Sequence, residues 1–196
     1  MNIEDEIEHT VVNEVFKLFK EKKFKEAKDL LYEIYLNNYE NLIDLSIKRL
    51  LIHNLAWAEN CLGEISNAEQ YILQIKSEIE DDPDYINNNL FDYCLILNLY
   101  CEIFKDELSI DEYKEINLFV SNYHHENGSM GREYIALTNV YKVTQKWDDI
   151  ISLLLNLKKH NANEYFINEI LRELEKNNIE AFDKAYCLLN GGEIYV

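Results

Sequence analysis

The chain has one proline and five glycines in 196 residues, so it lacks the turn residues that an all-β fold needs. It has no apolar run near the roughly 20 residues of a membrane-spanning helix. The N-terminal stretch MNIEDEIEH is acidic where a secretory signal peptide is basic. These absences favour a helical, cytoplasmic protein.

A basic patch is also missing. The formal net charge is −18, and the densest basic run, residues 20–28, is interrupted by Glu21 and Glu26. Phosphate backbones and anionic membranes repel such a surface, so we expect direct binding to neither nucleic acid nor membrane. The same charge attracts cationic peptides or proteins.

The cysteines show neither CxxC spacing nor paired clustering, and no set of His or acidic ligands accompanies them. This usage indicates reduced, packed thiols in the cytosol and no metal site. The four cysteines are Cys61, Cys94, Cys101 and Cys187.

No arrangement of residues suits catalysis. Glu59 and Glu102 fall in different repeats without a partnered histidine, which general acid–base chemistry would need. His124, His125 and Glu126 are adjacent and point in different directions, which disfavours a metal site and favours a surface turn. With no glycine-rich phosphate loop and no nucleophile elbow, we expect no enzyme activity and no cofactor.

A short pattern recurs along the chain after polar breaks. An apolar residue is followed by a small or aliphatic residue three positions later and a large one after four more, at 24–31, 65–72 and 147–154. The first two occurrences are 41 residues apart and the last two are 82 apart, which is twice that spacing. A further occurrence is therefore predicted around Ser109, with Asp106 in the opening apolar position.

Each repeat is expected to be two antiparallel amphipathic helices, because apolar residues on both sides of each break follow helical spacing. Asp82 and Pro83 predict a helix start, and Gly191 with Gly192 predicts the end of the last helix. The final pair follows at a shortened spacing of 32 residues, as expected of a capping repeat. We expect a single domain, 1–196, with helix pairs at roughly 1–40, 44–82, 83–124, 129–160 and 163–190.

The opening of the second helices, with an aromatic or aliphatic residue, then a small or aliphatic one, then a large one, resembles the tetratricopeptide repeat. The resemblance covers nearly the whole chain. It implies an all-α, right-handed superhelical array of about five antiparallel helix pairs, an α-solenoid. The chain departs from the family in its longer period, since the family repeats about every 34 residues. HEAT-like arrays, with periods of about 40–47, are the alternative fold.

In this register the first helices line a concave groove, and an asparagine recurs on its wall. An asparagine amide can pair with both the N–H and the C=O of an extended peptide. The aromatic side chains could form apolar pockets, the two basic ones could hold a carboxylate, and His53 is either a groove donor or a packed ring. The candidate peptide- or partner-binding residues are Phe16, His53, Trp57, Asn60, Phe91, Asn98, Glu102, Arg132, Asn139 and Lys142.

The architecture and the asparagine column resemble the RRNPP family of Gram-positive pheromone receptors, in which such arrays hold short linear peptides. The resemblance implies a regulatory protein of a low-GC Gram-positive bacterium or its phage. Many members begin with a helix-turn-helix, for which the first repeat leaves no room.

The alternative function is an acidic adaptor or neutralising partner, of the immunity or anti-repressor type, that works through its outer surface. Salt distinguishes it from groove binding, because charge-driven binding weakens with screening. The apolar tail residues Ile194, Tyr195 and Val196 could cover either the core of the last helix pair or the edge of a partner chain, so a homodimer is left open.

Overall fold

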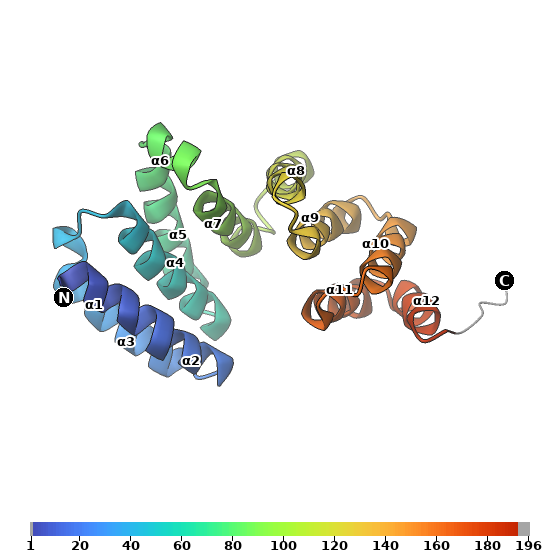
Figure 1. The fold of residues 1–196 in the computed structure, drawn as a ribbon, viewed down its shortest axis with the longest axis horizontal. Coiled ribbons are helices and arrows are strands. Elements are labelled where there is room, and N and C mark those ends of the chain that lie inside the picture. Colours follow the sequence, from blue (N-terminus) through green and yellow to red (C-terminus); the bar gives the residue numbers. More distant parts are fainter. Residues whose placement is uncertain (1, 192–196) are drawn as a thin grey trace. The chain divides into compact units, whose positions relative to one another are not determined.

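The computed structural model describes residues 2–191, which are all-α and contain no β-strand (Figure 1). The chain divides into two compact units, Met1–Glu107 and Leu108–Val196. The division lies inside the helix pair expected at 83–124. A single continuous array over 1–196 therefore stays a prediction, and each unit is described by itself.

The first unit begins with one continuous helix that contains a π-helical turn, and its later helices pack in sequence. The second helix, α3, packs on the first helix and on α4, while α5 packs on α4 and α7. One apolar core runs through the unit from Ile7 to Ile103. The elements are α1 (Ile3–Thr10), η1 (Val11–Val15), α2 (Phe16–Lys20), α3 (Phe24–Asn38), η2 (Tyr39–Asn41), α4 (Leu45–Leu62), α5 (Ile65–Glu80), α6 (Pro83–Asn88) and α7 (Leu90–Ile103).

The second unit has its own core, centred on α10, α11 and α12. Successive helices pack on one another. In addition, α9 contacts α11, and α10 contacts α12. Contact between each element and its nearest neighbours in sequence is what stacked helix pairs produce, so the packing is consistent with a helical repeat. The helices are α8 (Ile110–Glu126), α9 (Met130–Val143), α10 (Trp147–Lys159), α11 (Glu164–Asn177) and α12 (Ile179–Leu189).

The turns between paired helices repeat the predicted period in their backbone conformation. Lys22, Gly63 and Gln145 all have left-handed φ angles, of 58°, 78° and 56°. The next residue in each turn donates its backbone N–H to the carbonyl five residues earlier, at 2.9, 3.0 and 2.8 Å. This is the Schellman arrangement that satisfies the last carbonyls of a helix. The three positions are 41 and 82 residues apart, as the side-chain pattern predicted.

Two of these turns are expected to carry backbone strain, because a left-handed conformation costs a side-chain-bearing residue about 1 kcal/mol. Lys22→Gly and Gln145→Gly should each raise the free energy of unfolding by about 0.5–1 kcal/mol, and Gly63→Ala should lower it by a similar amount. Urea unfolding followed by circular dichroism measures these changes. Glu21→Gly is the control, since Glu21 has an ordinary φ of −82°. Equal effects of Lys22→Gly and Glu21→Gly on the free energy of unfolding would contradict backbone strain at Lys22.

Four of the five second helices begin where the sequence pattern predicts, at Phe24, Ile65, Trp147 and Ile179. Phe24 turns back onto the first helix, with its ring centroid 6.2 Å from that of Phe19. The small residues Ala27 and Ala68 are completely buried. The interpretation of this pattern as a contact with the first helix is confirmed for Phe24, whereas the opening residues Ile65 and Ile179 are 40% and 56% exposed.

In the third helix pair, the start of the second helix was predicted about one turn too early. Asp106 lies in the turn before α8, and Ser109 does not lie inside the helix but caps it. The Ser109 side chain accepts a hydrogen bond from the Glu112 backbone N–H, and the Glu112 carboxylate accepts one from the Ser109 backbone N–H. This capping box fixes the helix start at Ile110.

The helix expected after Asp82 starts as predicted but is interrupted. Asp82 caps α6 by accepting from the Tyr85 backbone N–H at 2.9 Å, and Pro83 occupies the first turn. Asn89, with φ −129° and ψ 42°, separates α6 from α7. At the other end of the chain, Gly191 follows α12 with a φ of 79°. Gly192, and the tail residues Ile194, Tyr195 and Val196, lie outside the described residues.

Hydrogen bonds link equivalent positions of the first two helix pairs. The Tyr35 hydroxyl donates to Gln74 Oε1 at 3.4 Å, and the Tyr39 hydroxyl donates to Glu78 Oε1 at 2.7 Å. The first bond joins α3 to α5, the second joins η2 to α5, and each spans 39 residues. The two second helices thus stack in nearly the register that the 41-residue period predicts.

Candidate functional site

One face of the first unit brings together side chains from three first helices. Trp57 on α4 packs on Phe19 of α2, with ring centroids 4.3 Å apart. One turn further along α4, the Asn60 side-chain N–H donates to Glu102 Oε1 on α7 at 3.1 Å. These two contacts place α2, α4 and α7 beside one another along a single strip.

We call this strip the first-helix face and define it by Phe16, Trp57, Asn60, Asn98 and Glu102. Phe16 lies one turn before Phe19, and Asn98 lies one turn before Glu102, so each shares a helix side with its neighbour. Phe16, Asn98 and Glu102 are exposed, while Trp57 and Asn60 are partly exposed. Five of the ten residues predicted for the site are therefore gathered on one surface.

Phe91 lies on the same side of α7 as Asn98 and Glu102, two to three turns towards the helix start. Its side chain is 40% exposed. The side chain at this position thus extends the apolar part of the first-helix face towards the other end of α7.

His53 is a packed ring that joins α4 to α7. It is partly buried one turn before Trp57 and forms a hydrogen bond with the backbone of Leu95. Burial, and to a smaller extent the Arg49 guanidinium, lower the pKa of His53, the bond to Leu95 opposes them, and the net result is a pKa of about 4. Of the two interpretations of His53 left open by the sequence, the packed ring fits this environment.

The low pKa of His53 predicts a loss of stability in mild acid. The unfolded imidazole has a pKa near 6.5 and the folded one about 4, so between these values the unfolded state binds more protons and stability falls as the pH falls. Between pH 7 and pH 5 the wild type should lose about 1–2 kcal/mol that His53→Gln does not lose. Urea unfolding across this range measures the difference, with His9→Gln, at an exposed histidine, as control. Parallel curves for wild type and His53→Gln would contradict the prediction.

In the second unit, two predicted site residues are engaged in helix packing. The Asn139 side-chain N–H donates to Asn117 Oδ1 on α8 at 3.0 Å, and Asn117 is buried. Lys142 forms an ion pair with Glu173 on α11 at 2.6 Å. Asn139 thus belongs to a contact between α8 and α9, and a column that joins it with Asn60 and Asn98 of the first unit stays a prediction.

Arg132 lies at an open cavity of about 350 Å³ at the starts of α9 and α11, beside His160 and Phe166. Lys142 is not among its lining residues. The structure therefore does not bring the two basic residues together at this cavity, and a shared carboxylate site formed by them stays a prediction.

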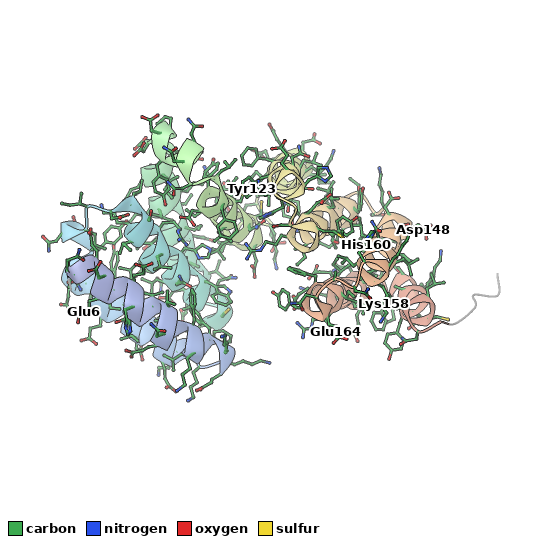
Figure 2. The ribbon with its side chains drawn as sticks, viewed as in Figure 1. Glu6, Tyr123, Asp148, Lys158, His160 and Glu164 are labelled. Atoms are coloured by element: carbon green, nitrogen blue, oxygen red, sulfur yellow. The ribbon has the colours of Figure 1, made fainter. Side chains whose placement is uncertain are left out.

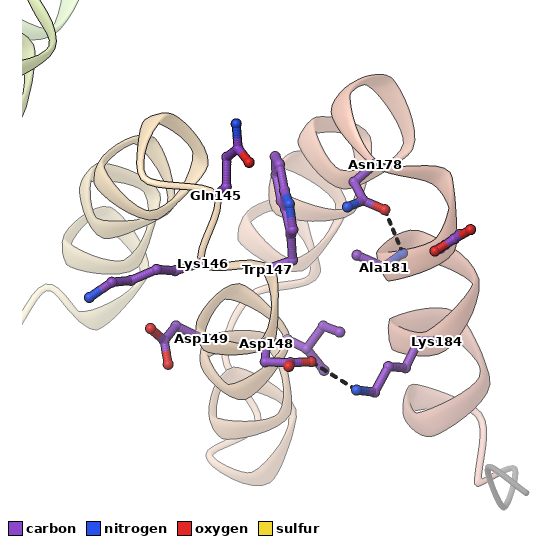
Figure 3. Close-up of a pocket in the computed structure, with 10 residues that line it drawn as sticks. Gln145, Lys146, Trp147, Asp148, Asp149, Asn178, Ala181 and Lys184 are labelled. Carbon is purple, nitrogen blue, oxygen red and sulfur yellow. Dashed lines mark hydrogen bonds and ion pairs between the residues drawn. The ribbon is translucent and has the colours of Figure 1, made fainter. Parts of the chain in front are cut away.

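A second cavity in this unit, of about 420 Å³, was not predicted from the sequence (Figure 3). It lies between the start of α10 and the start of α12, with Trp147 on one side and Ala181 on the other (Figure 3). Lys184 closes one edge through an ion pair with Asp148 at 2.8 Å. Its lining contains three acidic and two basic side chains, so it presents no dominant charge to a ligand. No motif in the sequence indicated this cavity.

A buried ion pair behind the first-helix face was also missed. The Glu59 carboxylate, with 4% of its side chain exposed, pairs with Lys28 on α3 at 3.2 Å. It also accepts a hydrogen bond from Asn67 on α5 at 3.4 Å. Glu59 stands where the tetratricopeptide pattern that the chain resembles usually has an apolar residue or tyrosine, and this departure was the only signal in the sequence. The cluster ties α3, α4 and α5 together.

No family model, curated protein or solved structure matches this chain.

Within the described residues, none of the helices is both long and apolar enough to cross a bilayer. The same part of the chain contains no group of three or more His, Cys, Asp or Glu side chains placed to hold a metal ion. Exposed charged side chains instead project from the helices, including Glu6 on α1, Asp148 on α10 and Glu164 at the start of α11 (Figure 2).

Proposed function

We propose that this chain is a non-catalytic binding module whose first-helix face holds a short linear peptide or an extended segment of a partner protein. The observation that supports it most is the Asn60–Glu102 bridge beside the Trp57 ring. An amide, a carboxylate and an aromatic surface on adjacent helices offer hydrogen bonding and apolar contact at once. The resemblance to tetratricopeptide arrays and to RRNPP receptors points to the same regulatory role.

The polar groups of this face are suited to a peptide backbone. Asn98 is exposed and Asn60 is partly exposed. Among the described residues, none donates a hydrogen bond to the Oδ1 atom of either asparagine. A backbone N–H could donate to either oxygen, and a backbone carbonyl could accept from the Asn98 amide. The neighbouring aromatic rings would bury an apolar side chain and supply contact area at low entropic cost.

The test begins with selection of heptapeptides from a random display library against the full chain. Binding is then measured in a Trp147→Phe variant, in which Trp57 is the remaining tryptophan of the two. We expect a saturable change in Trp57 emission. Asn98→Ala should weaken binding by about 1–3 kcal/mol without a loss of stability. Asn37→Ala, which removes an exposed asparagine on α3, is the matched control. An unchanged Trp57 spectrum, or equal affinity of Asn98→Ala and wild type, would refute the proposal.

The net charge of −18 supports a second candidate, an acidic adaptor or neutralising partner that binds through its outer surface. Salt separates the two candidates. Binding driven by the overall charge should weaken steeply between about 50 and about 300 mM salt, because added salt shortens the range over which exposed charges attract a partner. Binding dominated by apolar contact at Trp57 should change little over that range.

A further inference from the structure

We infer that the ligand of the first-helix face carries a basic residue that pairs with Glu102 and an apolar residue, two positions away, that packs on Trp57. The inference rests on the proposed function and specifies the chemical class of the peptide. It follows from how the carboxylates of the first unit are neutralised and from the spacing of Glu102 and Trp57.

The carboxylates that bridge helices in the first unit are mostly paired with cations. Glu59 pairs with Lys28 at 3.2 Å, Glu78 with Lys48 at 3.5 Å and Asp92 with Arg49 at 3.1 Å. Glu102 also bridges two helices, but the group that it meets is the neutral Asn60 amide.

Among the described residues, no Lys, Arg or His forms an ion pair with Glu102 within 4.0 Å. The amide fixes one carboxylate oxygen in place without cancelling its charge. The exposed Glu102 thus presents a positioned negative charge to the ligand, and the charge of −18 on the whole chain attracts cations to it. A guanidinium fits such a carboxylate better than an ammonium, because it can donate two parallel hydrogen bonds.

The apolar part of the site lies one helical turn from this charge. Trp57 precedes Asn60 by three residues, which corresponds to about 4.5 Å along the α4 axis, and Glu102 is reached across the hydrogen bond from Asn60. In an extended peptide, residues i and i+2 point to the same side and are separated by about 6.6 Å. Adjacent residues point to opposite sides. We therefore assign the two contacts to peptide residues two apart and not to neighbours.

Three pools of acetylated, amidated heptapeptides test this inference on the full chain. The first has arginine with leucine two positions away, the second has arginine with leucine adjacent, and the third repeats the first with citrulline, a neutral isostere, in place of arginine. All other positions hold a mixture of Ala, Ser, Asn and Gly. We expect the first pool to bind about tenfold more tightly than either of the others, as charge-assisted hydrogen bonds and correct spacing require.

The variants identify which carboxylate is responsible. In Glu102→Gln the preference for arginine over citrulline should disappear. In Glu33→Gln, which removes the same charge from an exposed position on α3, it should persist. Equal binding of arginine and citrulline pools to wild type, or equal losses in the two variants, would overturn the inference.

The outcomes also separate this inference from the proposed function. Display-selected peptides that change Trp57 emission but lack a basic residue would overturn the inference and leave the proposed function standing. If neither the selected peptides nor any pool binds, both fail.

Discussion

Lys28→Met is expected to lower the free energy of unfolding by about 3 kcal/mol, because it leaves the Glu59 carboxylate buried without a counter-charge. The Glu59 side chain is 4% exposed and that of Lys28 is 25% exposed. Water can therefore reach the lysine more readily than the carboxylate. The remaining contact of Glu59, with Asn67, is a neutral hydrogen bond that cannot replace the ion pair. Chemical unfolding of the variant measures the loss.

The matched variants should respond asymmetrically. Glu59→Leu leaves a lysine that can turn towards solvent, so it should cost clearly less than Lys28→Met. The double variant Lys28→Met with Glu59→Leu should recover to within about 1 kcal/mol of the wild type, since both charges are then gone. Single variants that each cost below about 1 kcal/mol would contradict the role assigned to this ion pair.

Gly131→Ala is expected to lower the free energy of unfolding by about 2–3 kcal/mol through overpacking. Gly131 is buried near the start of α9, and a Cβ atom there would lie 2.6 Å from Phe166 Cγ and closer still to two other ring carbons. The whole ring would have to move, and α11 with it. Chemical unfolding of the full chain, followed by circular dichroism, measures the effect.

Two further variants show whether the Phe166 ring causes this loss. Gly131→Ala should cost less in a Phe166→Leu background, because the smaller side chain leaves room for the methyl group. Gly128→Ala is the control: a Cβ there meets nothing within 4 Å, and only its φ of 68° opposes substitution, at about 1 kcal/mol. Equal costs at Gly131 and Gly128 would refute the close approach of α9 to α11.

The sequence was sufficient to predict the helix pairs because their signal is local. A polar break, an apolar residue and a small or aliphatic residue at fixed spacing mark the start of a second helix, and Phe24, Ile65 and Trp147 all begin one. Ser109 misled the same reasoning, since a small residue can fill a helix contact or cap a helix, and its partner Glu112 decides between the two. The π-helical turn at Val11–Val15 has no comparable signature.

The candidate site could be predicted only in part because its chemistry depends on residues of other helices. Helical spacing placed Trp57, Asn60 and Glu102 on exposed sides of their helices. Spacing alone could not indicate that Asn60 would bind Glu102. The same limit applies to Asn139, whose amide is directed to Asn117 on a neighbouring helix.

The location of the binding face is tested most directly by cysteine protection. Cys61 is exposed one turn after Trp57, and Cys187 on α12 of the second unit is partly exposed, so the expectation of packed thiols holds only for the buried Cys94 and Cys101. Rates of alkylation by iodoacetamide at Cys61 and Cys187 are measured by mass spectrometry with and without a saturating display-selected peptide. We expect the rate at Cys61 to fall about tenfold, as steric exclusion at an occupied face requires, with no change at Cys187. Protection of Cys187, or of neither cysteine, while the peptide is bound would contradict a binding face on α2, α4 and α7.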